Sequence, residues 1–125
     1  MAYSIVESQV PNQVSVIVSG EVPIQEILNF ITTHRGSHER LFAFLFDITD
    51  AAMSLTAEQV RQLATFAAGE ARKGPMGPVA FISSNPGPFG VMRMYQAHSS
   101  AQGRHNLGVF RTQDDAQAWL KTLNR

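Results

Sequence analysis

The sequence contains no cysteine. This absence excludes disulfide bonds, thiolate zinc sites, iron–sulfur clusters and cysteine nucleophiles. An excess of either charge is also missing, because ten Lys and Arg residues balance ten Asp and Glu residues. A chain without net charge has no general electrostatic attraction to nucleic acid or anionic lipid. We therefore expect neither nucleic acid nor a membrane among its partners.

Long apolar segments are missing as well. The longest uninterrupted apolar run covers residues 41–46, well short of the ~20 residues of a membrane-spanning helix. Residues 1–10 lack the basic start and apolar block of a secretory signal, so we expect a cytoplasmic location. The chain of 125 residues is 44% hydrophobic and shows no repeat or linker. It is therefore expected to fold as a single domain that spans residues 1–125.

What is present is an alternation of strand-like and helix-like segments. Residues 3–7 and 13–19 alternate in polarity around a Pro-Asn turn, which predicts a hairpin. Further strands are predicted at residues 79–82 and 107–110. Helices are predicted after Pro23, after Thr56, over about residues 89–99, and after Thr112. Thr56 with Gln59 has the spacing of a capping box.

The apolar run at residues 41–46 sets the expected topology. A short run without polar positions is typical of a central strand that helices cover on both faces. With the other elements it predicts an α/β fold in the order ββαβαβαβα. The sheet should have five strands, mostly parallel, with one antiparallel strand from the first hairpin. The flanking helices should pack on its faces.

Polar residues follow two of the predicted strands. Asp47, Thr49 and Asp50 come after residue 46, and a second group follows residue 82. That second group is Ser83, Ser84 and Asn85. Open α/β sheets bind ligands at the carboxyl ends of their strands. Oxygen ligands there would suit Mg²⁺, and a helix N-terminus would suit phosphate, although the same residue types are ordinary in turns and caps.

The third predicted helix is unusually apolar. Phe89, Met92 and Tyr95 are spread around more of its circumference than a simple surface helix allows, and Arg93 lies among them. Either the helix is deeply buried, or one side meets a partner or an apolar ligand. Arg93 could project to solvent, pair with Asp47 or Asp50, or mark an interface.

Histidine offers little support for a metal centre. His34 and His38 have the spacing of two ligands on one helix face, but Gly36 between them disfavours a continuous helix. A zinc site also needs three or four converging ligands. We expect no metal, no cofactor and no catalytic residue.

The element order and two stretches resemble a known group of domains. The first stretch is residues 41–50 with the helix after Thr56. The second is residues 89–95 (FGVMRMY) with the ending V-F-R-x-x-x-D-A-x-A-W-L over residues 109–120. They are similar to the small bacterial STAS/Sec14-like proteins, and thus to anti-sigma-factor antagonists, transporter STAS domains and lipid-binding Sec14 domains. The resemblance covers nearly the whole chain, but its motifs are mainly packing motifs.

The resemblance implies a non-enzymatic interaction or regulatory module, expected as a homodimer or bound to a protein partner. In the antagonists a serine at the start of the second helix is phosphorylated; here only Thr56 keeps a hydroxyl, and its expected role is the helix N-cap. The alternatives are a small apolar-ligand binding protein and a metal-dependent phosphoester hydrolase using Asp47 and Asp50. The predicted contact surface comprises Asp47, Thr49, Asp50, Thr56, Ser83, Ser84, Asn85, Phe89, Met92, Arg93 and Tyr95.

Overall fold

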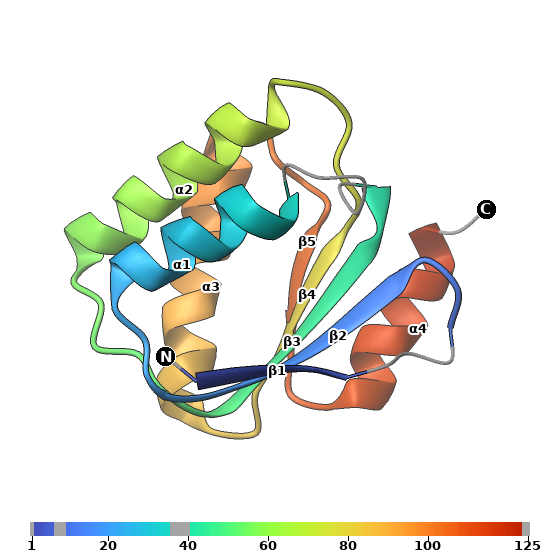
Figure 1. Ribbon diagram of the computed structural model, residues 1–125, viewed down its shortest axis with the longest axis horizontal. Coiled ribbons are helices and arrows are strands. Elements are labelled where there is room, and N and C mark those ends of the chain that lie inside the picture. The colour runs from blue at the N-terminus through green and yellow to red at the C-terminus, as the bar shows by residue number, and fades with distance from the viewer. Residues whose placement is uncertain (1, 7–9, 36–40, 124–125) are drawn as a thin grey trace.

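The computed structural model describes residues 2–6, 10–35 and 41–123. Its elements run in the order β1 (Ala2–Val6), β2 (Gln13–Glu21), α1 (Ile24–Phe30), a π-helical turn η1 (Ile31–Arg35), β3 (Ala43–Ala52), α2 (Ala57–Ala71), β4 (Val79–Ile82), α3 (Pro86–Ala101), β5 (Leu107–Phe110) and α4 (Gln113–Leu123) (Figure 1). The predicted ββαβαβαβα order is confirmed.

The described strands form one sheet in the order β1-β2-β3-β4-β5. β1 pairs with β2 antiparallel, and the other three pairings are parallel. β3 is therefore the middle strand, as its apolar sequence predicts. From β2 to β5, each parallel connection leads to the neighbouring strand in the same direction across the sheet. Because such connections are right-handed, the helices within them, α1, α2 and α3, lie on the same face of the sheet.

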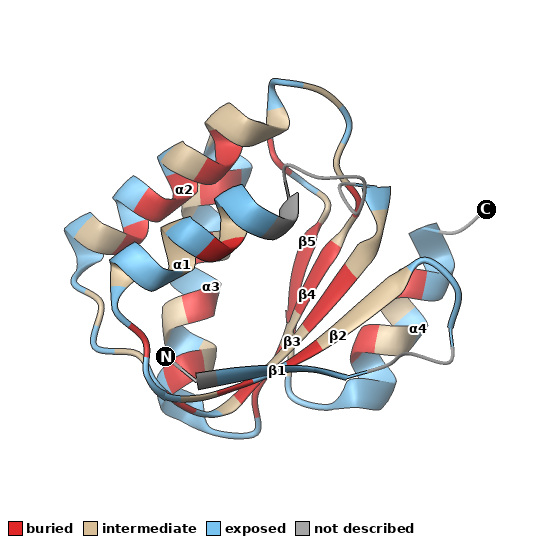
Figure 2. Cartoon of the chain, viewed as in Figure 1, coloured by how far each residue is buried: buried red, intermediate tan, exposed pale blue. Residues whose placement is uncertain are grey.

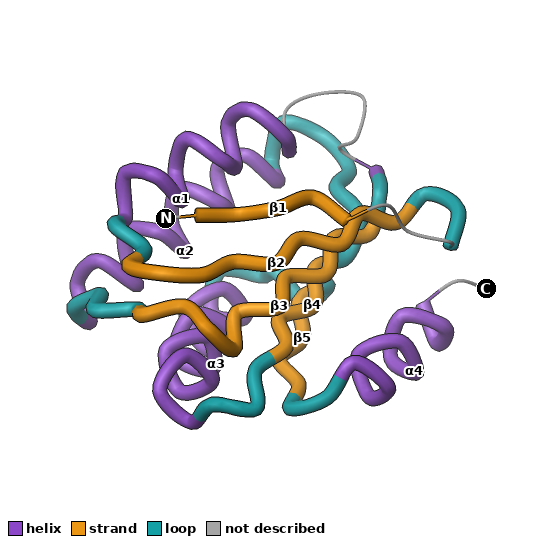
Figure 3. Tube along the Cα trace, turned by 60° about the horizontal axis from the view of Figure 1, so that its bottom comes forward, coloured by secondary structure: helices purple, strands orange, loops and turns teal. Residues whose placement is uncertain are grey.

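Figures 1 and 3 show α1, α2 and α3 covering one face of this sheet and α4 packed on the other. Successive residues of β3 serve the two layers, because strand side chains alternate between faces. Phe44 and Phe46 belong to the larger core beneath α1–α3. Leu45 belongs to a smaller core with Ala116 and Leu120 of α4. The buried residues follow this division along the strands and the inward sides of the helices (Figure 2).

The middle strand differs from its prediction at both ends. Leu41 is 65% exposed and the strand begins at Ala43, because Ala43 and Phe44 are the first residues with partners on β2 and β4. At its other end β3 continues past residue 46, where the predicted strand ends, to Ala52. β2 also continues, to Glu21, and pairs with β3 as far as Ala52 across an irregularity in register. Asp47, Thr49 and Asp50 are therefore strand residues.

The third helix begins earlier than predicted. Asn85 is its N-cap, with a side-chain oxygen that accepts a hydrogen bond from the backbone N–H of Gly87 at 3.2 Å. Pro86 occupies the first helical position, where a missing N–H costs nothing. Residues 86–88, which precede the predicted helix, therefore form the first turn of α3.

Candidate functional site

The structure brings together the two polar segments predicted at the ends of β3 and β4. The backbone N–H of Ser84 donates to Thr49 Oγ1 at 3.3 Å, and Asn85 Nδ2 donates to the Thr49 carbonyl at 3.5 Å. Asp47 Oδ1 accepts from the Thr49 N–H at 3.1 Å. Ser83 is fully buried and its Oγ donates to the Asn85 carbonyl at 2.8 Å. These hydrogen bonds join the second half of β3 to the segment between β4 and α3.

This arrangement does not assemble a metal centre. Asp50 is exposed, and no group of three or more His, Asp or Glu residues suited to a metal occurs in the described part of the chain. His38 and the side chain of His34 lie outside the described residues. Thr56 caps α2, since its Oγ1 accepts from the Gln59 N–H at 3.1 Å and Gln59 Oε1 accepts from the Thr56 N–H at 2.9 Å. The predicted capping box is confirmed.

Helix α3 separates into an inward and an outward side. Met92 is 2% exposed and Tyr95 is 3% exposed, and both belong to the larger core. Phe89 is half-buried, and the guanidinium carbon of Arg111 lies 4.2 Å from the centre of its ring. Arg93 is exposed, and the structure records no ion pair for it within the described residues. The apolar residues of α3 therefore serve mainly the interior.

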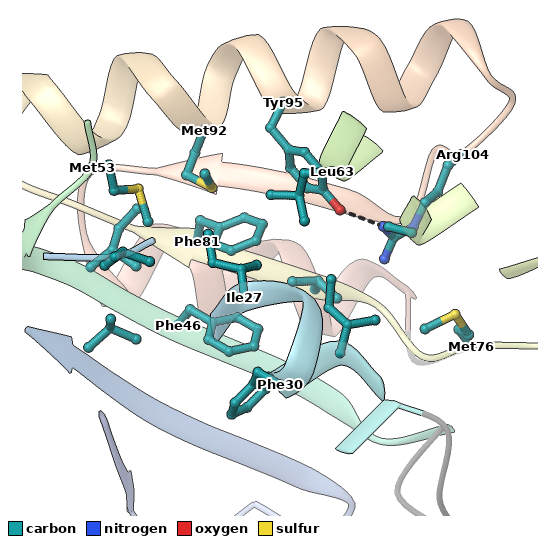
Figure 4. Close-up of a pocket in the computed structure, with 16 residues that line it drawn as sticks. Ile27, Phe30, Phe46, Met53, Leu63, Met76, Phe81, Met92, Tyr95 and Arg104 are labelled. Carbon is teal, nitrogen blue, oxygen red and sulfur yellow. Dashed lines mark hydrogen bonds between the residues drawn. The ribbon is translucent and has the colours of Figure 1, made fainter. Parts of the chain in front are cut away.

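That interior contains an apolar cavity between the sheet and the layer formed by α1, α2 and α3 (Figure 4). Its volume is about 80 Å³. Phe46 and Phe81 approach it from the sheet, Leu63 from α2, and Met92 and Tyr95 from α3. The volume is several times the ~10–15 Å³ that one water requires. Because most of its lining residues are apolar, the cavity favours an apolar guest over water.

Aromatic rings make up the floor of this cavity. The rings of Phe46 and Phe81 stack at 5.4 Å between centres, and Tyr95 meets Phe81 edge-on at 5.9 Å. Phe30 of α1 meets Phe46 edge-on at 5.4 Å. Such pairs add stability beyond the area that they bury. The floor is therefore a set of aromatic rings that pack against one another.

Three of the other side chains that line the cavity are methionines. Met53 precedes α2, Met76 precedes β4, and Met92 lies on α3. Methionine adapts its shape more readily than branched side chains. α1 contributes Ile27 and Phe30 and is only seven residues long, with Phe30 as its one buried residue. The methionine side chains give these walls more conformational freedom than the aromatic floor has.

One end of the cavity is polar. Arg104 is the single charged residue among the described residues that line it, and it is 9% exposed. Its Nη1 donates to the hydroxyl of Tyr95 at 2.9 Å, as the dashed line in Figure 4 shows. The cavity thus combines a long apolar wall with one cationic end.

Sequence reasoning identified only part of this site. Met92 and Tyr95 are among the predicted site residues, but Phe30, Met53, Met76 and Arg104 are not. Loops carry no apolar period, so nothing in the pattern marks Met53, Met76 or Arg104 as inward-facing. The available signal for Arg104 is the preceding Gly103, whose φ of +86° is typical of the turn that ends a helix and reverses the chain.

No protein-family model matches the chain, and the search of curated proteins finds no significant match. Within the described residues, none of the helices combines the length and the apolar character that crossing a bilayer requires.

Proposed function

We propose that this protein binds a small apolar ligand in the cavity between its sheet and helices α1–α3. The cavity itself is the observation that carries the proposal, because close-packed cores contain few voids larger than a water molecule. Its 80 Å³ is about half the ~150 Å³ of an engineered cavity that holds benzene. Binding therefore involves an outward shift of the adaptable walls formed by the methionines and α1.

The resemblance to lipid-binding Sec14 domains agrees with this proposal. A role as an interaction module, with a homodimer as its expected form, stays a prediction. Met92 and Tyr95 were expected on its contact surface, yet both side chains are buried and face the cavity. We therefore place ligand binding first among the proposals.

A titration with octan-1-ol tests the proposal. This alcohol combines an apolar chain with an uncharged polar end, so its binding reports on the cavity and not on charge. We expect saturable binding by the wild-type protein, measured by calorimetry and by a rise in the unfolding temperature as ligand is added. Absence of saturable binding to the wild-type protein would reject the proposal.

A pair of leucine variants tests where the alcohol binds. Ala67 lies on α2, is 2% exposed and lines the cavity, so Ala67→Leu places added carbon atoms inside it. We expect affinity to fall at least about fivefold, because inserting bulk into an occupied core costs roughly 1–3 kcal/mol. Ala57, exposed at the start of the same helix, provides the matched control Ala57→Leu. Equal affinities for the two variants would place the binding elsewhere.

A further inference from the structure

The turn after α3 places an arginine inside the protein. α3 ends at Ala101, and Gly103 takes a positive φ. The chain then reverses, so that the backbone N–H of Arg104 donates to the carbonyl of Ser99 at 3.0 Å. The Arg104 side chain consequently lies beside Tyr95 at one end of the cavity (Figure 4).

Among the described residues, no anionic group pairs with this guanidinium. Its one recorded side-chain hydrogen bond runs to the hydroxyl of Tyr95, and its buried Nε has no hydrogen-bond partner in the described part of the chain. The ion pairs recorded within the described residues are Arg61 with Glu58 and Lys73 with Glu70, with one or both side chains largely exposed. Buried cations in proteins are normally paired, because an unpaired one loses its hydration without compensation.

A second unsatisfied group belongs to the same turn. Ser99 lies one helical turn after Tyr95, on the same face of α3, and is fully buried. Its Oγ also lacks a hydrogen-bond partner. Within the described residues these are the two buried side-chain polar atoms without partners, and the backbone hydrogen bond from Arg104 to Ser99 joins their residues. Both unsatisfied atoms thus belong to residues that meet at the turn after α3.

We propose that the ligand is an apolar carboxylic acid of medium chain length, with its carboxylate on Arg104 and its hydrocarbon in the cavity. This inference rests on the proposed function and specifies the ligand class. A planar guanidinium presents paired donors that match the two oxygens of a carboxylate. The Tyr95 hydroxyl lies within hydrogen-bonding distance of the same guanidinium and can donate to the bound carboxylate.

The donor set favours a carboxylate over a phosphate monoester. A phosphate group carries close to two negative charges and three acceptor oxygens at neutral pH. Arg104 and Tyr95 supply one positive charge and one hydroxyl, and the other described lining residues are apolar. A carboxylate needs no more than this, whereas a buried phosphate would keep uncompensated charge. The hydrocarbon would then lie along Phe46, Phe81 and Met92.

The test compares two ligands of equal chain length, octanoate and octan-1-ol, by calorimetry at neutral pH, where a carboxylic acid is ionised. We expect the wild-type protein to bind octanoate about tenfold to a hundredfold more tightly than the alcohol, the range that charge-assisted hydrogen bonds supply. In Arg104→Gln this preference should disappear while octan-1-ol still binds. Arg93→Gln removes the same charge from the exposed side of α3 and should keep the preference.

The outcomes separate this inference from the proposed function. If neither compound binds the wild-type protein, both proposals fail. If octan-1-ol binds but octanoate binds no more tightly, or if Arg104→Gln keeps the preference, the carboxylate assignment is wrong and the apolar-ligand function stands. Should Arg104→Gln fail to fold, Arg104→Lys is the alternative variant, because it keeps the positive charge but not the paired donors of the planar guanidinium. The preference for octanoate over octan-1-ol should then decrease without disappearing. An unchanged preference in that variant would also overturn the assignment.

Discussion

Replacing Ala67 by leucine should stabilise the protein, because the added atoms fill volume that the native core leaves free. Core cavities cost ~24 cal/mol per Å³, so a volume of 80 Å³ corresponds to about 2 kcal/mol. Some of this gain is lost to imperfect fit, and cavity-filling substitutions commonly yield ~0.5–2 kcal/mol. We expect a rise of about 1 kcal/mol in the free energy of unfolding, measured by urea denaturation with an unchanged m value.

The same helix supplies the decisive comparison. Ala64 lies three residues before Ala67 and is fully buried, but it does not line the cavity. Ala64→Leu therefore forces bulk into closely packed surroundings and should destabilise the protein by roughly 1–3 kcal/mol. If both substitutions destabilise the protein equally, the free volume beneath α2 is not there and the reasoning about the cavity is wrong.

Two local predictions concern the scaffold that holds the site. Thr56→Ala removes one half of the capping box with Gln59 and should lower the free energy of unfolding by about 1 kcal/mol; an unchanged urea midpoint would show that the cap contributes nothing. Gly77→Ala should prevent normal folding, because a Cβ there would overlap the backbone carbonyl oxygens of Leu41 and Phe42. A native near-ultraviolet circular dichroism spectrum for Gly77→Ala would contradict that steric reasoning.

The element order was accessible from sequence because each element carries a local signal. Thr56 and Gln59 mark the start of α2, and the apolar run near Phe44 marks the middle strand. These signals depend on residues that are close together in the sequence, so they can be recognised without knowledge of the fold. The order of elements and the parallel topology follow from them, and both are confirmed.

Element ends were less accessible because they depend on partners distant in sequence. Nothing local to Asp47 or Asp50 shows that β2 continues alongside and extends β3 through them. In the same way, Leu41 lies in an apolar run, yet it is exposed because β4 begins opposite Phe44. Pairing with neighbouring strands, and not residue type, therefore determines where β3 begins and ends.

The cavity could not be predicted from the pattern of residues. Its volume depends on how closely the short helix α1 approaches the rings of Phe46 and Phe81, and side-chain identity alone does not determine that distance. Arg104 was overlooked because it lies in a turn, where no periodicity distinguishes an inward residue from an outward one. Two of the predicted site residues, Met92 and Tyr95, do reach the cavity, because a helix that is apolar on several sides must bury some of them.

The methionine side chains allow the most direct measurement of apolar-ligand binding. Met53, Met76 and Met92 line the cavity, whereas Met94 is 41% exposed on the outer side of α3. The protein would be labelled with ¹³C at its methionine methyl groups and titrated with octan-1-ol while the methyl resonances are followed by NMR. We predict saturable shifts for Met53, Met76 and Met92 and little change for Met94. Shifts confined to Met94, or the same small drift at all four, would contradict a ligand site inside the protein.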